Sequence, residues 1–169
     1  MSESVGADEA SVADLRDRVR RAHRRYPTGV TVVTTMADGR PVGLACNAFA
    51  SVSLNPPLVL VCVNTAARSH DPLHAGEFIG INVLAGDQAD LARRFATTGQ
   101  DKFADVAWMP GTATGVPLLD SAAATFETVI EQRIPAGTHT IFVCAVVDVH
   151  STARDALLYV DGTYRACEA

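Results

Sequence analysis

The sequence predicts a mainly β domain, an antiparallel barrel with a few short helices. Segments rich in valine, threonine and other β-formers recur along the chain, short turns with glycine or proline separate them, and few segments show helical spacing. This pattern favours a barrel over a doubly wound α/β sheet. The glycine fingerprints of Rossmann and P-loop proteins are absent from the sequence, so a dinucleotide would be bound without them.

The length of 169 residues fits one domain with a sizeable core. Residues 1–10 are predicted to form a disordered tail, and residues 11–169 the folded domain. Ser11 is expected to cap a charged surface helix that runs to Arg25. Two further helices are expected, one over residues 69–74 with Ser69 as its cap, and one over residues 87–97.

The strands are separated by turns that are typical of hairpins. Turns are predicted at residues 37–40, 135–137 and 161–162. The strand of residues 58–63 is apolar on both faces, which predicts a core strand covered on two sides. Residues 102–120, with two prolines and two glycines, are expected to be mostly loop. The strands themselves are predicted over residues 28–36, a run from 41, 58–63, 78–84, 124–129, 138–149 and within 157–164.

Composition excludes two classes of partner. The formal charge of −5 and the pI near 5.4 argue against a nucleic acid or an anionic membrane, because either would favour a basic surface. No apolar run reaches the roughly 20 residues of a membrane span, and residues 1–10 do not resemble a secretion signal. We therefore expect a soluble protein of the cytoplasm with small-molecule chemistry.

The cysteines and histidines do not predict a metal site. Free thiols, mostly buried, are expected because no C-x-x-C pair occurs among the four cysteines. His70 and His74 are four residues apart and could share a helix face as metal ligands, but no third ligand is evident. A solvated helix start is the favoured interpretation. The four cysteines are Cys46, Cys62, Cys144 and Cys167.

Residues 47–61 are the most informative segment, because small and polar residues run through a bend into an apolar strand. An isoalloxazine ring needs an apolar slot, hydrogen-bond donors along one edge, and hydroxyls, amides or cations for its ribityl phosphate. Asn47 offers an amide and Ser51 a hydroxyl, and Gly29 lets the backbone approach a ring closely. An ordinary hairpin with a polar bend fits the spacing equally well.

Five segments, in order along the chain, resemble the flavin reductase family of two-component flavin monooxygenases. The resemblance extends from about residue 26 to residue 164. It implies an FMN-binding split β-barrel, Greek-key and antiparallel, that works as a homodimer. It also implies an NAD(P)H:flavin oxidoreductase that reduces free FMN or FAD with NADH or NADPH, the reduced flavin then diffusing to a partner monooxygenase. The five segments are residues 27–34, 47–61, 82–84, 101–103 and 137–139.

The resemblance also implies roles for individual residues. It places no catalytic side chain, because hydride transfer between two stacked rings needs positioning rather than a nucleophile or a metal. His139 is implied to face the nicotinamide, although Thr138 stands where the family commonly has an aspartate. The implied flavin residues are Thr28, Asn47, Ala48, Phe49 and Ser51 along the flavin, Val63 under the ribityl chain, and Arg68, Ser69 and Lys102 near the phosphate.

Two other functions remain open from the sequence. One is a split-barrel protein that binds flavin or carries electrons without NAD(P)H turnover. The other is a small barrel that serves as an interaction module without a cofactor. A solvated surface cation is likewise an open interpretation of Arg68 and of Lys102.

Overall fold

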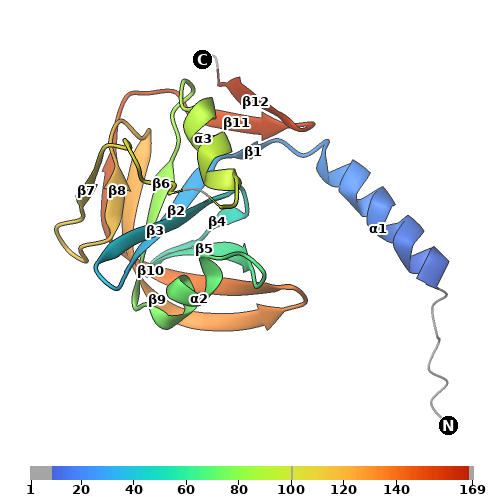
Figure 1. Ribbon diagram of the computed structural model, residues 1–169, viewed down its shortest axis with the longest axis horizontal. Helices are drawn as coiled ribbons and strands as arrows, with labels where there is room; N and C mark the ends of the chain where they lie inside the picture. Colours follow the sequence, from blue (N-terminus) through green and yellow to red (C-terminus); the bar gives the residue numbers. More distant parts are fainter. Residues whose placement is uncertain (1–8, 100, 168–169) are drawn as a thin grey trace, which may run out of the picture.

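A computed structural model describes residues 9–99 and 101–167 (Figure 1). Its centre is a seven-stranded antiparallel sheet in the order β3-β2-β6-β9-β10-β5-β4. The sheet curls, so that Sγ of Cys46 at the end of β3 lies 3.5 Å from the carbonyl oxygen of Cys62 in β5. The predicted mainly β fold is confirmed. The strands are β2 (Thr31–Ala37), β3 (Arg40–Cys46), β4 (Phe49–Leu54), β5 (Pro57–Asn64), β6 (Phe78–Val83), β9 (Ala124–Ala136) and β10 (His139–Ser151).

Strand β5 shows how the sequence pattern forms the core. Val59, Val61 and Val63 are buried and pack inside the barrel, because alternate side chains of a strand point to the same face. The other face, which includes Leu60 and Cys62, is only half-buried. The apolar character of both faces therefore has two causes: one face forms the core, and the other borders a cavity described below.

A second, three-stranded sheet contains β1 (Thr28–Gly29), β11 (Leu157–Val160) and β12 (Thr163–Ala166), in the order β1-β11-β12. The hairpin turns predicted at residues 37–40 and 161–162 are confirmed. In each of them an aspartate and the following glycine have positive φ, 50° and 72° in the first and 51° and 78° in the second. Such angles suit the right-handed twist of the flanking strands.

Helix α1 (Glu9–His23) begins two residues before the predicted Ser11 and ends two residues before Arg25. Residues 9 and 10 thus belong to the helix, and the rest of the predicted tail lies outside the described residues. Figure 1 shows α1 extending away from the barrel. Its apolar side chains, which would normally face a core, are correspondingly exposed: Val12 is 49% exposed, Leu15 53% and Val19 44%.

The two shorter helices pack against the barrel. Ser69 precedes α2 (His70–Ala75) as predicted, but its hydroxyl donates to the carbonyl oxygen of Gly43 at 2.9 Å instead of capping the helix. Helix α3 (Ala89–Ala96) lies against β3 and buries Phe95 completely. Both contacts meet at the middle of β3, which becomes one wall of the candidate site.

The prediction that residues 102–120 are mostly loop missed a short hairpin of β7 (Trp108–Pro110) and β8 (Pro117–Leu119). A buried carboxylate holds the connection between them. The Oε2 atom of Glu127 accepts hydrogen bonds from the backbone nitrogens of Ala113 (3.0 Å) and Thr114 (2.7 Å), and from the Thr114 hydroxyl (2.7 Å). A tertiary contact of this kind orders a segment whose local sequence favours a loop.

The expected solvated helix start at His70 is wrong. The ring of His70 is buried, with Nε2 2.9 Å from the Thr140 hydroxyl and Nδ1 2.9 Å from a carboxylate oxygen of Asp71. Within residues 9–99 and 101–167 no group of three or more potential metal ligands comes together, and no helix there is long and apolar enough to cross a membrane. All four cysteines are free: Cys46 and Cys144 are buried, Cys62 is half-buried and Cys167 is exposed.

Candidate functional site

A cavity of about 360 Å³ lies where β1 passes the start of β4 and the outer face of β5. We call it the Asn47 cavity. Five of the predicted flavin residues line it together, although they come from two separate segments of the chain. Leu60 and Cys62 of β5 add an apolar surface. The five residues are Thr28, Gly29, Asn47, Ala48 and Phe49.

The Asn47 cavity has room for a flat ring beside Gly29. A Cβ atom added to Gly29 would meet nothing within 4 Å, so the wall is backbone at that point. The φ angle of Gly29 is not in the left-handed region, so the backbone conformation at this position does not require a glycine. The open space beside Gly29 is compatible with an aromatic ligand that lies against the backbone.

One polar atom in the wall lacks a partner. The hydroxyl oxygen of Thr28 is buried and forms no hydrogen bond with any described residue. Leaving such a group unsatisfied costs about 1–3 kcal/mol, which native structures usually avoid. A bound ligand with a carbonyl or ring nitrogen would satisfy it if the Thr28 side chain turned its hydroxyl toward the cavity. The polar atom and the open wall at Gly29 both fit a flavin.

Replacing Thr28 by valine separates a ligand contact from a structural one. We expect T28V to unfold no more easily than the wild type in the absence of flavin, and to gain up to about 1 kcal/mol, because an unsatisfied hydroxyl is removed. Flavin should bind about 5- to 10-fold more weakly if the hydroxyl contacts it. Urea unfolding and flavin fluorescence titration measure the two effects.

Thr31 provides the matched control, because it lines the same cavity but its hydroxyl already donates to the Cys46 carbonyl at 2.7 Å. Thr31→Val should therefore destabilise the protein by about 1 kcal/mol. Unchanged flavin affinity in T28V would contradict a ligand role for the Thr28 hydroxyl.

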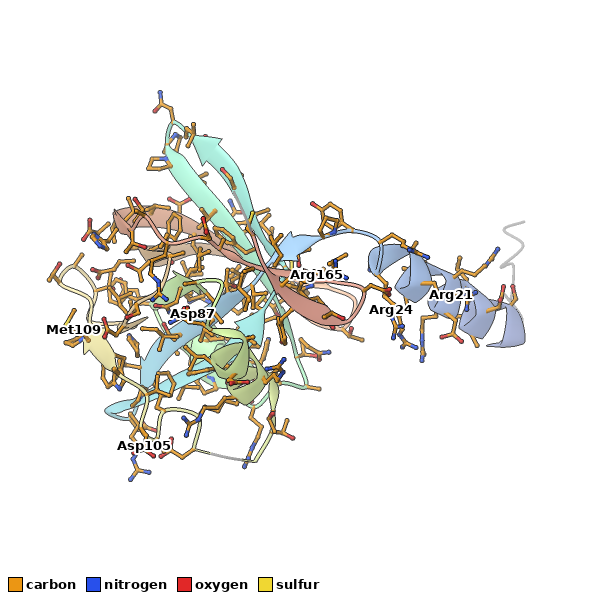
Figure 2. The ribbon with its side chains drawn as sticks, turned by 90° about the horizontal axis from the view of Figure 1, so that it is seen from above. Arg21, Arg24, Asp87, Asp105, Met109 and Arg165 are labelled. Carbon is orange, nitrogen blue, oxygen red and sulfur yellow. The ribbon has the colours of Figure 1, made fainter. Side chains whose placement is uncertain are left out.

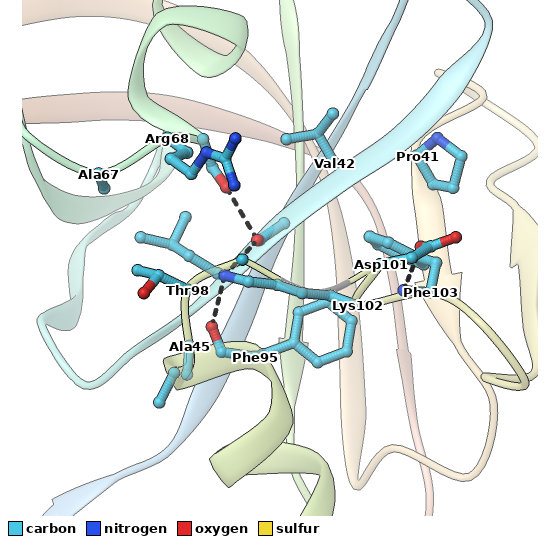
Figure 3. Close-up of a pocket in the computed structure, with 15 residues that line it drawn as sticks. Pro41, Val42, Ala45, Ala67, Arg68, Phe95, Thr98, Asp101, Lys102 and Phe103 are labelled. Atoms are coloured by element: carbon cyan, nitrogen blue, oxygen red, sulfur yellow. Dashed lines mark hydrogen bonds between the residues drawn. The ribbon is translucent and has the colours of Figure 1, made fainter.

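A second cavity, of about 300 Å³, lies between β3, α3 and the loop before α2 (Figure 3). We call it the Lys102 cavity. Its lining includes all three residues that the resemblance placed near a phosphate: Arg68, Ser69 and Lys102. Figure 3 shows Arg68 and Lys102 reaching the cavity from different segments. Two cations at one cavity form an arrangement that favours an anion.

The ammonium group of Lys102 is held in place by the backbone. Nζ donates to the carbonyl oxygens of Phe95 (2.8 Å) and Gly43 (3.3 Å), which uses two of its three hydrogens within the described chain. Partial burial, and then the positive charge of Arg68, lower the pKa of Lys102. An anion bound between the two side chains would relieve the repulsion and accept the third hydrogen.

The two cavities are neighbours along β3. A smaller cavity between them shares Ala45 and Ala96 with the Lys102 cavity and shares Asn47 with the Asn47 cavity. The three cavities form a row, which we call the groove along β3, with an apolar, amide-lined end and a cationic end. This matches a molecule with a flat ring at one end and a phosphate at the other.

Comparison with known proteins gives the family of the chain. The family model described as "Flavin reductase like domain" matches residues 23–168. This chain belongs to that family. It is 40% identical to an NADH-dependent FAD reductase of Streptomyces globisporus over 94% of this chain and 91% of the relative. It is 35% identical to the reductase subunit HsaB of a flavin-dependent monooxygenase of Rhodococcus jostii, over 99% of this chain and 87% of that one.

A solved structure supports the same assignment. The NADH:FAD oxidoreductase of Streptomyces globisporus, in complex with NAD and FAD fragments, superimposes with a TM-score of 0.84 at 40% identity. The match covers 89% of this chain and 91% of that chain. The flavin reductase family and its fold, predicted from sequence segments, are thus confirmed.

Three implied residues of this flavin reductase-like domain lie outside the two cavities. Ser51 is exposed in β4, beyond the edge of the Asn47 cavity. The Val63 side chain is fully buried in the barrel core, so only its backbone could approach a ligand. His139 begins β10 at the β9–β10 turn, with Nδ1 3.1 Å from the Thr138 hydroxyl, and lines none of the cavities described above. Its nicotinamide contact stays a prediction.

Sequence reasoning missed Leu60 and Cys62, which line the Asn47 cavity in place of Val63. The signal was present in the apolar character of both faces of β5. Burial raises the pKa of the Cys62 thiol, so the neutral form that lines the cavity is favoured. Cys62 thus contributes an apolar contact surface.

Proposed function

We propose that this protein uses NADH to reduce free FMN or FAD, and that the reduced flavin is passed to a partner monooxygenase. The observation that carries the proposal is the groove with an aromatic-sized, amide-lined cavity at Asn47 and a two-cation cavity at Lys102. The names of the relatives, an NADH-dependent FAD reductase and a monooxygenase reductase subunit, support it.

The protein contributes position rather than reactive groups. A flavin held there would supply the redox chemistry, as the acceptor of the nicotinamide hydride. Asn47 and Ala48 would hold the ring edge, Thr28 would donate or accept one hydrogen bond, and Leu60 and Cys62 would exclude water from one side of the cavity. Arg68, Ser69 and Lys102 would hold the phosphate. Fixing two rings in near contact is sufficient for large acceleration.

Oxidation of NADH, followed at 340 nm with and without added FMN, FAD or riboflavin, tests the proposal. We expect turnover only when flavin is added, and the same assay with NADPH determines the nicotinamide preference. Flavin binding without any turnover would favour the electron-carrying alternative. The absence of both flavin binding and NADH turnover would favour the interaction module and would contradict the proposal.

The cationic cavity predicts that affinity depends on the flavin phosphate. Lys102→Met should weaken FMN binding about tenfold and leave riboflavin binding within about twofold, because a charge-assisted hydrogen bond to the phosphate is lost. Titration of flavin fluorescence measures both. Arg94→Met on α3 removes a cation that does not line the Lys102 cavity and should change neither constant. An equal loss for both flavins would place the phosphate elsewhere.

We also propose a homodimer, located in the cytoplasm where its nicotinamide substrate is available. Exposed apolar side chains on β4 and β10, together with the exposed stripe of α1, support the dimer. Val52 is 48% exposed and Leu54 89% on β4, and Val147 is 48% and Val149 54% on β10. Light scattering after size-exclusion chromatography should give twice the chain mass of 17.8 kDa.

A further inference from the structure

A third cavity, of about 540 Å³, lies between the end of α1, the β11–β12 hairpin and the Asn47 cavity. We call it the Arg24 cavity. It shares Tyr26, Thr28, Asn47 and Ala48 with the Asn47 cavity, so the two are adjacent. A molecule with one end at the proposed flavin ring could therefore extend into it. Its basic residues Arg20, His23 and Arg24 belong to none of the sequence motifs and line none of the cavities of the groove along β3.

Basic side chains converge on the Arg24 cavity. Arg20, His23 and Arg24 line it, against the single carboxylate of Asp161. Arg20 is partly neutralised by Asp17, at 3.1 Å on the exposed face of α1. No ion pair to the Arg24 guanidinium is formed within residues 9–99 and 101–167. A diphosphate would supply the missing negative charge.

The wall also offers an aromatic surface. The side chain of Tyr26 is 71% exposed, so its ring is available for stacking. Tyr159 also lines the cavity, and its ring lies 5.2 Å from that of Tyr164. Purine bases stack on exposed aromatic rings. Arginines beside an exposed tyrosine are suited to an adenosine diphosphate group.

The backbone fixes this arrangement. The carbonyl oxygen of Arg24 accepts a hydrogen bond from the Asp161 nitrogen at 2.9 Å, so the end of α1 is attached to the β11–β12 hairpin. Figure 2 shows Arg24 at this junction and Arg21 further along the helix. The basic side chains are thereby held close to the ring cavity, although most of α1 extends away from the barrel.

Both FAD and the nicotinamide dinucleotide contain an adenosine diphosphate group, and the positions of the cavities distinguish between them. The flavin phosphate, and hence the adenosine half of FAD, is assigned to the Lys102 end of the groove. The Arg24 cavity borders the Asn47 cavity through Thr28 and Tyr26, which the Lys102 cavity does not include. We propose that the Arg24 cavity binds the adenosine diphosphate half of the nicotinamide dinucleotide. This inference rests on the proposed flavin reductase function.

The test compares Arg24→Glu, just after the end of α1, with Arg21→Glu, which makes the same charge change in the last turn of α1 at a residue that does not line the cavity. With FMN as acceptor, R24E should raise the KM for NADH about tenfold and change kcat less than twofold. In calorimetric titration, ADP should bind the wild type and R21E, and bind R24E about tenfold more weakly. The affinity for FMN should be unchanged. R24Q, which removes the positive charge without adding a negative one, should give a smaller loss than R24E and provides the test if R24E folds poorly.

Several results would overturn the inference. Equal effects of R24E and R21E would show a general effect of surface charge. No binding of ADP to the wild type, or a loss in R24E of FAD affinity but not of NADH affinity, would remove the nicotinamide dinucleotide from this cavity. Failure of the wild type to bind FMN or to oxidise NADH would instead contradict the proposed function. The wild-type measurements therefore distinguish failure of the proposed function from failure of this inference.

Discussion

Replacing Gly29 by valine should abolish useful flavin binding while the protein stays folded. Nothing lies within 4 Å of a Cβ atom built on Gly29, and its φ angle is acceptable for any residue, so a valine fits the strand. Gly29 lines the Asn47 cavity, however, and we expect the methyl groups of a valine there to reduce the space left for the ring. A clash with a rigid ring costs about 1–3 kcal/mol, which predicts up to about 100-fold weaker binding.

Fluorescence titration with FMN measures the effect, and circular dichroism and urea unfolding show whether the fold is intact. Gly29→Ala should give a smaller loss, because it adds one carbon atom. Thr163→Val is the matched control: it introduces the same side chain at an exposed position of β12, in the same three-stranded sheet and away from the cavity. Wild-type FMN affinity in a folded G29V protein would show that the ring binds elsewhere.

The parts of the site that lie in one short segment could be predicted from the sequence. Asn47, Ala48 and Phe49 follow one another in the chain, and strand spacing places them at one bend. Gly29 and Thr28 reach the same cavity through the pairing of β1 with β11, which has Thr28 opposite Tyr159 and Gly29 opposite Leu158. That pairing joins residues about 130 positions apart, a separation that local pattern does not determine.

The burial of Val63 in the core, with Leu60 and Cys62 in the cavity wall, has a different origin. A strand that is apolar on both faces gives no sign of which face points to the core, and a shift of one residue exchanges the two faces. The pairing of Phe49 with Val61 and of His139 with Asn64 fixes the register in the structure. With this register Val63 faces the core, while Leu60 and Cys62 face the cavity.

Glu127 could not be predicted as a structural centre, because its hydrogen-bond donors are mainly backbone groups. In the sequence it is one polar residue in an alternating strand. In the structure its side chain is only 2% exposed and accepts three hydrogen bonds from the β7–β8 connection, and Gly111 leaves no room for a Cβ beside the carboxylate. Backbone donors are present in every residue, so sequence pattern does not identify them.

Replacing Glu127 by alanine should therefore cost stability more than any surface change. Two backbone N–H groups and one hydroxyl would lose a charged acceptor, and each such bond contributes about 1.5–3 kcal/mol. Because water can reach part of the released loop, we expect a net loss of about 3 kcal/mol and a fall in Tm of about 6–12 °C.

Urea unfolding and calorimetry measure the loss in E127A, and Glu131→Ala provides the control. Glu131 is on the same strand β9 but exposed, and its removal should change the free energy of unfolding by less than about 0.5 kcal/mol. Glu127 lines neither the Asn47 nor the Lys102 cavity, so folded E127A should keep wild-type flavin affinity at low temperature. If E127A were as stable as E131A, the β7–β8 hairpin would be stabilised by its own turn, and the hydrogen bonds of the Glu127 carboxylate would contribute nothing measurable to stability.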